Sequence, residues 1–173
     1  PLYSYPNGQY ASEWEKLLSF KPKPNATVIV VINPNNGPGN QADNVFVEKI
    51  NQLKSKNFKV LGYIYTNYSN RDLNEVKNDV DKWITLYGNI DGFFIDEAVN
   101  GKSEYYRQIT DYIKSKSQNI LTIGNIGTEV TTDYFNIFDK IVIAEMPYQQ
   151  FLNYSLHYDY SKIEPQNKCV IVY

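Results

Sequence analysis

Residues 90–98, with the sequence IDGFFIDEA, decide the fold, because a short apolar run there ends directly in two acidic residues. Within it, Gly92–Asp96 is brief and rich in aromatic and branched side chains, which predicts a buried strand. Segments of helical hydrophobic period flank this strand at residues 72–87 and 103–116. A buried strand between two such helices is typical of βα units in a parallel sheet.

The same alternation extends in both directions along the chain. Short apolar runs predict seven strands, at residues 2–5, 27–33, 60–65, 92–96, 120–124, 140–144 and 168–173. The segments between them are predicted to be helical or irregular, at residues 11–20, 43–56, 72–87, 103–116, 128–138 and 147–160. Segment 128–138 has little periodicity, whereas 147–160 is predicted to be a helix.

Two parallel architectures fit this pattern: an open doubly wound sheet and a (β/α)8 barrel. The chain has 173 residues, which suits one domain, and no stretch of its composition resembles a linker. A complete barrel usually needs about 200 residues or more, and no helical segment follows the last apolar run, CVIVY. We therefore predict an α/β fold with one domain over residues 1–173: a (β/α)8-type, TIM-like barrel that is incomplete, with seven visible βα strands, or closed differently.

The composition narrows the range of partners and cofactors. Lys and Arg number 17 against 19 Asp and Glu, so the basic excess typical of nucleic acid binding is missing. No apolar run approaches the roughly 18 residues of a membrane-spanning helix. With one cysteine and one histidine, this chain offers no cysteine or multi-histidine metal cluster, so we expect no metal. It also carries no strong phosphate-binding motif, so we expect no cofactor.

Polar and aromatic residues at the strand ends are the candidate site residues, since both architectures bind ligands at the carboxyl ends of their strands. Three of them are acidic: Asp96 and Glu97 after the apolar run at 92–95, and Glu145 after the run at 140–144. The aromatic and amide candidates are Tyr5, Asn33, Tyr65, Tyr68 and Asn125. Carboxylates can serve as acid, base or nucleophile on a glycosidic bond, amides bind sugar hydroxyls, and aromatic rings stack on sugar faces.

Plainer interpretations stand beside these. Acidic strand ends also occur as helix caps or salt bridges. Asp91 begins the strand that Asp96 ends, so we expect it at the opposite, stabilising face. We expect Asp139 to be solvated, His157 to lie on a partly exposed helix, and Cys169 to be a small core residue.

Four segments in order, PLYSYP (1–6), VIVVINPNNGPG (28–39), VLGYIYTNYSNR (60–71) and IDGFFIDEA (90–98), resemble the spherulin-4 family, also called spherulation-specific family 4. The resemblance implies a (β/α)8-type barrel. It also implies a glycoside hydrolase related to fungal galactosaminogalactan hydrolase, acting on α-1,4-linked galactosamine-containing polysaccharide. It implies catalytic carboxylates at Asp96 and Glu97, and a third at Glu145. Tyr3 or Tyr5, Asn33, Tyr65 and Asn125 would line the groove.

The leading hypothesis is therefore a monomeric, extracellular or cell-surface glycosidase with a polysaccharide substrate. Three N-glycosylation sequons, at Asn25, Asn67 and Asn153, are consistent with secretion. The alternative is a non-catalytic glycan-binding cell-surface or coat protein on the same barrel. A third hypothesis, a small-molecule enzyme on an open α/β sheet, would predict a cofactor.

Overall fold

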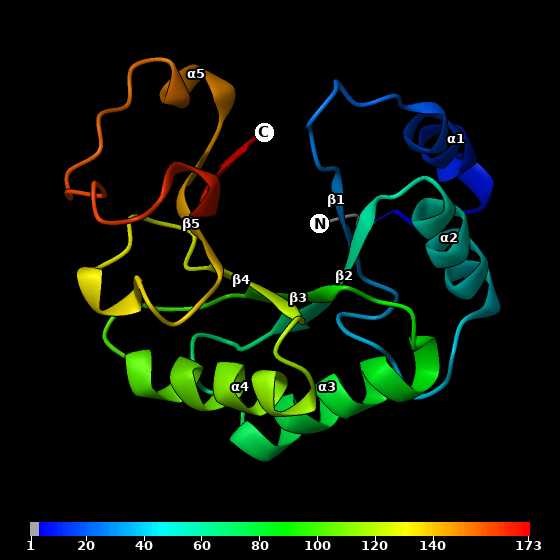
Figure 1. Cartoon of the computed structure of the whole chain (residues 1–173), viewed down its shortest axis with the longest axis horizontal. Coiled ribbons are helices and arrows are strands. Elements are labelled where there is room, and N and C mark those ends of the chain that lie inside the picture. Colours follow the sequence, from blue (N-terminus) through cyan, green and yellow to red (C-terminus); the bar gives the residue numbers. More distant parts are fainter. Residues whose placement is uncertain (1–3) are drawn as a thin grey trace. The chain divides into compact units, whose positions relative to one another are not determined.

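The structure is a computed structural model that describes residues 4–173. Strands and helices alternate along most of the chain (Figure 1). The strands are β1 (Ile29–Ile32), β2 (Lys59–Tyr65), β3 (Gly92–Asp96), β4 (Leu121–Asn125), β5 (Lys140–Met146) and β6 (Lys168–Val172). The α-helices are α1 (Ala11–Ser19), α2 (Asn44–Ser55), α3 (Leu73–Tyr87), α4 (Ser103–Lys116) and the short α5 (Tyr148–Phe151). Single 3-10 turns occupy Gly8–Tyr10, Thr132–Tyr134 and Pro165–Asn167.

The strands form one six-stranded sheet in the order β1-β2-β3-β4-β5-β6, so each strand's sheet neighbour is also its neighbour in sequence. The β1–β2, β4–β5 and β5–β6 pairs are parallel. The register of β4 and β5 sets Asn125 beside Val142, and an irregularity between Val142 and Ala144 interrupts the pairing of β5 with β6. The prediction of an α/β fold with a parallel sheet is thereby confirmed.

Six of the seven predicted strands are confirmed, each to within two residues at either end. The seventh, at residues 2–5, lies partly outside the described residues, and Ser4 and Tyr5 belong to no strand. The predicted helix at 147–160 is wrong beyond Phe151, since only α5 is helical there. Its continuation turns away because the backbone amides of His157 and Tyr158 donate to the carboxylate of Glu129 rather than to helix carbonyls.

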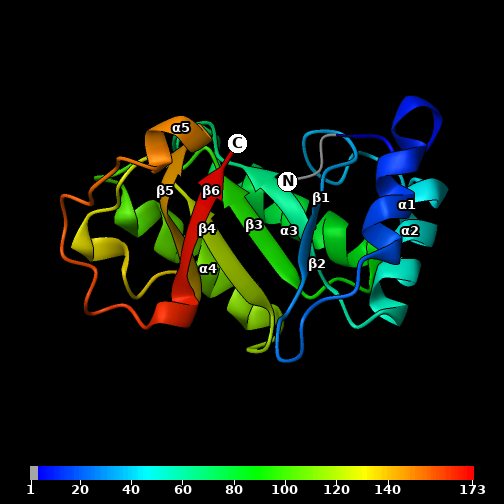
Figure 2. The ribbon, with the colours of Figure 1, turned by 90° about the horizontal axis from the view of Figure 1, so that it is seen from above.

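The chain divides into two compact units, and the first comprises the described residues up to Ile64 together with Asn78–Phe93. Here α1 and α2 lie side by side (Figures 1 and 2). The buried rings of Trp14 and Phe46 meet edge to face, with their centroids 6.1 Å apart. Gly62 of β2 lies directly under the indole of Trp83, where an added Cβ would approach the ring to 2.6 Å. The close approach of strand backbone and ring therefore requires glycine at this position.

Asp91 at the start of β3 stabilises the first unit, as its position in the sequence predicted. Its carboxylate binds Lys54 Nζ at 2.5 Å and Lys59 Nζ at 3.3 Å, and it accepts a hydrogen bond from the Val60 amide at 2.8 Å. Burial acts to raise the pKa of this carboxyl, but the Lys54 and Val60 contacts outweigh it and lower the pKa overall.

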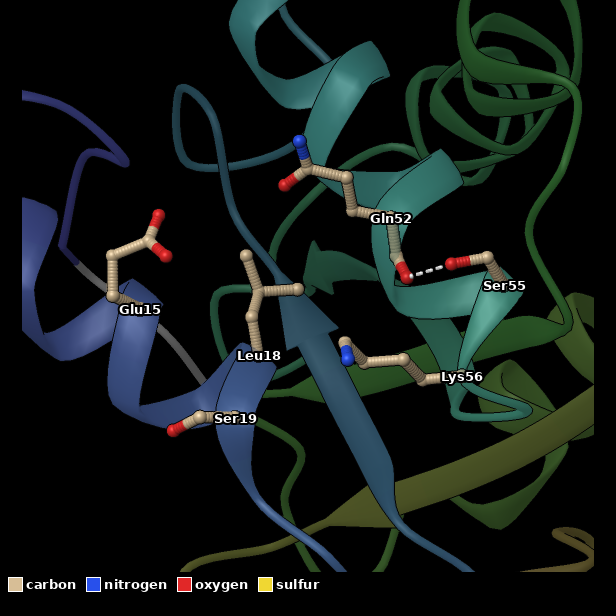
Figure 3. Close-up of a pocket in the computed structure, with 6 residues that line it drawn as sticks. All are labelled: Glu15, Leu18, Ser19, Gln52, Ser55 and Lys56. Carbon is tan, nitrogen blue, oxygen red and sulfur yellow. Dashed lines mark hydrogen bonds between the residues drawn. The ribbon is translucent and has the colours of Figure 1, made fainter.

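A surface hollow lies between α1 and α2 in the first unit (Figure 3). It is lined by Glu15, Leu18, Ser19, Gln52, Ser55 and Lys56. The Ser55 hydroxyl points back to its own helix and donates to the Gln52 carbonyl at 2.7 Å. None of the predicted site residues lines this hollow.

The second unit comprises Tyr65–Lys77 and Phe94–Tyr173. Figure 2 shows β4, β5 and β6 close together in this unit, and β5 lies between β4 and β6 in the sheet. Tyr106, Ile109 and Ile113 lie on one face of α4 and are fully buried. Gly124 of β4 lies against the ring of Phe138, which an added Cβ would overlap, so this strand too has a glycine beneath an aromatic side chain.

Candidate active site

Asn125, at the end of β4, joins two acidic side chains from its neighbouring strands. Its Nδ2 donates to Asp96 Oδ1 at 2.8 Å and to Glu145 Oε2 at 2.8 Å. Asp96 is the last residue of β3, and Glu145 lies one residue before the end of β5. The three side chains meet because parallel neighbouring strands end at the same edge of the sheet. Sequence reasoning had selected all three.

The orientation of the Asn125 amide is fixed by a third contact. Its Oδ1 accepts a hydrogen bond from the backbone N–H of Gly127 at 3.1 Å, so the NH2 group faces the carboxylates. Both N–H bonds of this amide are therefore directed to carboxylate oxygens. Gly127 has φ +70, a left-handed conformation that favours glycine, and this turn brings its amide back toward Asn125.

Burial differs between the amide and the acids. Asn125 is only 5% exposed, while Asp96 and Glu145 are half-buried. Among the described residues, the Glu145 carboxylate accepts one hydrogen bond, from Asn125. A carboxylate has about four lone-pair positions, so Glu145 keeps acceptor capacity for a ligand.

Glu97 follows Asp96 in a strained backbone conformation. Its φ is +51, and the three consecutive residues Asn67, Tyr68 and Ser69 also have positive φ. The two segments are joined, since the Tyr68 amide donates to the Glu97 carbonyl at 2.7 Å. Left-handed backbone costs roughly 1–2 kcal/mol for a non-glycine residue, and such strain concentrates at functional sites. The turn leaves the Tyr68 ring 56% exposed.

Tyr65 at the end of β2 is held by Arg71, a contact that sequence reasoning missed. The guanidinium lies 4.2 Å from the Tyr65 ring centroid, and its Nη1 donates to the Tyr65 carbonyl at 2.8 Å. Arg71 also approaches Glu75 at 3.8 Å. A cation over one ring face leaves the opposite face of Tyr65 for packing or for a ligand.

Tyr5 and Asn33, the remaining predicted site residues, are described within the first unit and have partners there. The Tyr5 hydroxyl donates to Asp43 Oδ2 at 3.1 Å. Asn33 Oδ1 accepts a hydrogen bond from the Gly37 amide at 2.8 Å and so closes the loop that follows β1. Their role in a site remains a prediction.

Two other residues have partners that the sequence did not predict. Asp139 is partly solvated, as expected, but it also accepts hydrogen bonds from Lys114 Nζ at 2.6 Å and from the Thr122 amide at 2.8 Å. His157 lies in a loop rather than on a helix, and its Nδ1 is 2.6 Å from Glu129 Oε1. Glu129 itself was overlooked, because no strand ends beside it in the sequence. Cys169 is half-buried, and burial raises the pKa of its thiol.

Within residues 4–173, no group of three or more His, Cys, Asp or Glu side chains is arranged to hold a metal ion. No helix in that part of the chain combines the length and apolar character needed to span a membrane.

Comparison with known proteins assigns the chain to a family. Spherulin-4 of Physarum polycephalum is 34% identical over 148 residues, which are 84% of this chain but only 43% of that protein. The crystal structure of Aspergillus clavatus Sph3 in complex with GalNAc has 28% identity and a TM-score of 0.81, and the match covers 99% of this chain and 75% of that one. The model of spherulation-specific family 4 matches residues 1–173. The chain therefore belongs to spherulation-specific family 4.

Proposed function

We propose that this chain is a glycoside hydrolase that cleaves α-1,4-linked galactosamine-containing polysaccharide. The observation that carries the proposal is the pair of carboxylates, Asp96 and Glu145, that share the amide of Asn125. Glycoside hydrolysis needs two carboxyl groups from different parts of a site facing one glycosidic bond. The structural similarity to Sph3, crystallised with GalNAc, supports an amino sugar as the ligand.

In a retaining reaction the two carboxyl groups have separate roles. One carboxyl group donates its proton to the leaving glycosidic oxygen while the other attacks the anomeric carbon to form a glycosyl-enzyme ester. Water then releases the sugar, with the first group acting as base. We assign these two roles to Asp96 and Glu145, with Glu97 supporting them.

The aromatic residues supply the surface on which the sugar rings rest. The half-buried ring of Tyr65 and the exposed ring of Tyr68 would stack on pyranose C–H groups. Tyr5 and Asn33 would extend the binding groove. The protein acts as an extracellular or cell-surface monomer on an incomplete (β/α)8-type barrel in this proposal.

Substitution of Asp96 by Asn tests the assignment. The variant keeps the size of the side chain but can neither donate a carboxylic proton nor attack, so we expect turnover to fall by about 10²–10⁴. Products from a panel of α-linked galactosamine and galactose polymers are measured by mass spectrometry. The matched control is Asp91→Asn, at the other end of the same strand, which should lower stability and leave turnover intact. Full turnover by Asp96→Asn on every polymer would refute the assignment.

A non-catalytic, glycan-binding role is the second candidate. Two carboxylates held side by side would also attract the ammonium group of an unacetylated galactosamine by charge alone. The pH dependence separates the two functions, since an acid and a base in the site give a bell-shaped profile of kcat/KM. A pure binding protein would retain the polymer and release no shorter product at any pH.

A further inference from the structure

Glu129, in the loop after β4, gathers a set of hydrogen bonds from one distant segment. Its carboxylate is buried, with only 6% exposed. It accepts hydrogen bonds from the backbone amides of His157 at 2.8 Å and Tyr158 at 3.0 Å, and it binds His157 Nδ1 at 2.6 Å and the hydroxyl of Tyr154. All of these donors belong to residues 153–160, which we call the 153–160 loop.

The 153–160 loop depends on this carboxylate because its apolar side chains contribute little burial. Leu156 is 46% exposed and Tyr158 is 47% exposed, so neither anchors the loop in a core. The exception is Tyr160 at the far end, which is buried and whose hydroxyl accepts from the Val130 amide at 2.9 Å. Both anchors of the loop, the carboxylate and the Val130 amide, therefore lie in the segment after β4.

The segments that follow the three site-bearing strands meet at Glu129. Glu129 lies four residues after Asn125 in the sequence, and the 153–160 loop follows β5, the strand of Glu145. The segment after β3, the strand of Asp96, joins them through Asn100, whose Nδ2 donates to the Glu129 carbonyl at 2.9 Å. Asn100 Oδ1 in turn accepts from the Thr131 amide at 3.1 Å.

We propose that Glu129 is a positioning residue that holds the 153–160 loop as an aromatic binding surface beside the carboxylate pair, where Tyr158 contacts the amino-sugar polymer. This inference rests on the proposed function. Glu129 does not touch the substrate in this account. It accepts the loop's amide and hydroxyl protons as a carboxylate, and the loop then presents its outward tyrosine in one fixed place. Fixing a loop before binding strengthens affinity, because the ligand no longer bears the cost of ordering it.

The test combines Glu129→Gln with a readout that needs no substrate. Hydrogen exchange of the His157 and Tyr158 amides reports the loop directly, and we expect their protection to fall by about tenfold or more in the variant. Steady-state kinetics on a galactosamine polymer should show KM rising about tenfold while kcat stays within about twofold. Tyr158→Ala should raise KM similarly and leave the His157 amide protected. Asp139→Asn is the control. The Asp139 carboxylate lies at the amino end of β5, away from the loop, so we expect KM to be unchanged.

Each outcome decides the proposal. Loss of amide protection with unchanged KM would show that the 153–160 loop is held by Glu129 but takes no part in binding, which overturns the inference. Unchanged protection in Glu129→Gln would overturn it at the first step. A wild-type chain that neither binds nor cleaves any galactosamine polymer would instead refute the proposed function, and this inference with it. The exchange data would then still show whether the carboxylate holds the loop.

Discussion

A carboxylate lies at each end of the β4–β5 strand pair, and the two carboxylates differ in their hydrogen-bond partners. At the start of the pair, Asp139 is bound by the Lys114 ammonium at 2.6 Å and by the amide and hydroxyl of Thr122 at 2.8 and 3.0 Å. At the finish, the Glu145 carboxylate receives one N–H from Asn125, and that amide also serves Asp96. Both carboxylates lie beside the same two parallel strands.

The difference separates a stabilising carboxylate from one available for chemistry. Oδ2 of Asp139 binds a cation, a backbone amide and a hydroxyl, and these contacts join α4, β4 and β5. Within the described part of the chain, Glu145 is positioned by a single neutral donor and keeps lone pairs for a proton or a sugar carbon. Asp91 of the first unit repeats the pattern of Asp139 at the start of β3. The number and charge of the protein donors thus distinguish Asp91 and Asp139 from Glu145.

Removal of the negative charge from Glu145 and from Asp139 should give the largest and most different effects. We expect Glu145→Gln to lower kcat by about 10²–10⁴ through loss of an acid or nucleophile, with stability changed by no more than about 0.5 kcal/mol. Asp139→Asn should do the reverse, costing about 1–2 kcal/mol of stability through its charged hydrogen bonds while kcat is retained. Chemical denaturation and initial rates on the polymer measure both. Equal effects of the two substitutions on kcat would contradict the distinction.

Substitution of Gly124, which lies in β4 between the two ends, should lower stability strongly without changing any charge. Gly124→Ala adds a Cβ that overlaps the Phe138 ring, and overpacking of this kind costs about 1–3 kcal/mol. Gly101→Ala is the matched control, because Gly101 has a positive φ but open space around its Cβ position, and backbone strain alone costs about 1–2 kcal/mol. Thermal unfolding compares the pair. A smaller loss for Gly124→Ala than for Gly101→Ala would contradict the close packing of Phe138 on β4.

The smallest predicted effect is a local pH response at Glu129, a saturated carboxylate on the same side of the sheet as the site. Burial acts to raise its pKa, but hydrogen bonds from Tyr154, His157 and Tyr158 outweigh it and lower the pKa to about 2. A lowered folded-state pKa means that the contribution to stability is present above the unfolded value near 4.5 and is lost as the pH falls toward 2. The amide signals of His157 and Tyr158, followed by NMR, should shift within that window. In Glu129→Gln the same signals should not titrate there.

The sequence predicted the residues at the carboxyl ends of the strands better than the residues that surround them. Asp96, Asn125 and Glu145 were found because each lies at the end of a β-branched or aromatic run, and parallel strands bring such ends together. The partners of Asp139 were missed because they lie 17 and 25 residues away, on β4 and α4. Glu129 and its loop were missed for the same reason: 28 residues separate the carboxylate from His157, and the segment around Glu129 has little periodicity.

The helix predicted over 147–160 failed for a related physical reason. Its aromatic and aliphatic residues are compatible with a helix, but the buried Glu129 carboxylate offers the backbone amides of His157 and Tyr158 a stronger acceptor than a carbonyl. Tertiary contacts thus override local propensity where a charged group is buried nearby. No pattern within residues 147–160 encodes that acceptor.

The strand order also bears on how the chain folds during synthesis. Each strand pairs with the strand made just before it, so the sheet can grow in the order in which the ribosome releases its segments. Pairing between strands one helix apart keeps loop closure short, which favours rapid addition of each βα unit to its predecessor. Among residues 4–173, β6 lies at one end of the strand order, and its Val170 and Val172 are exposed, so this strand gains the least protection from its neighbours.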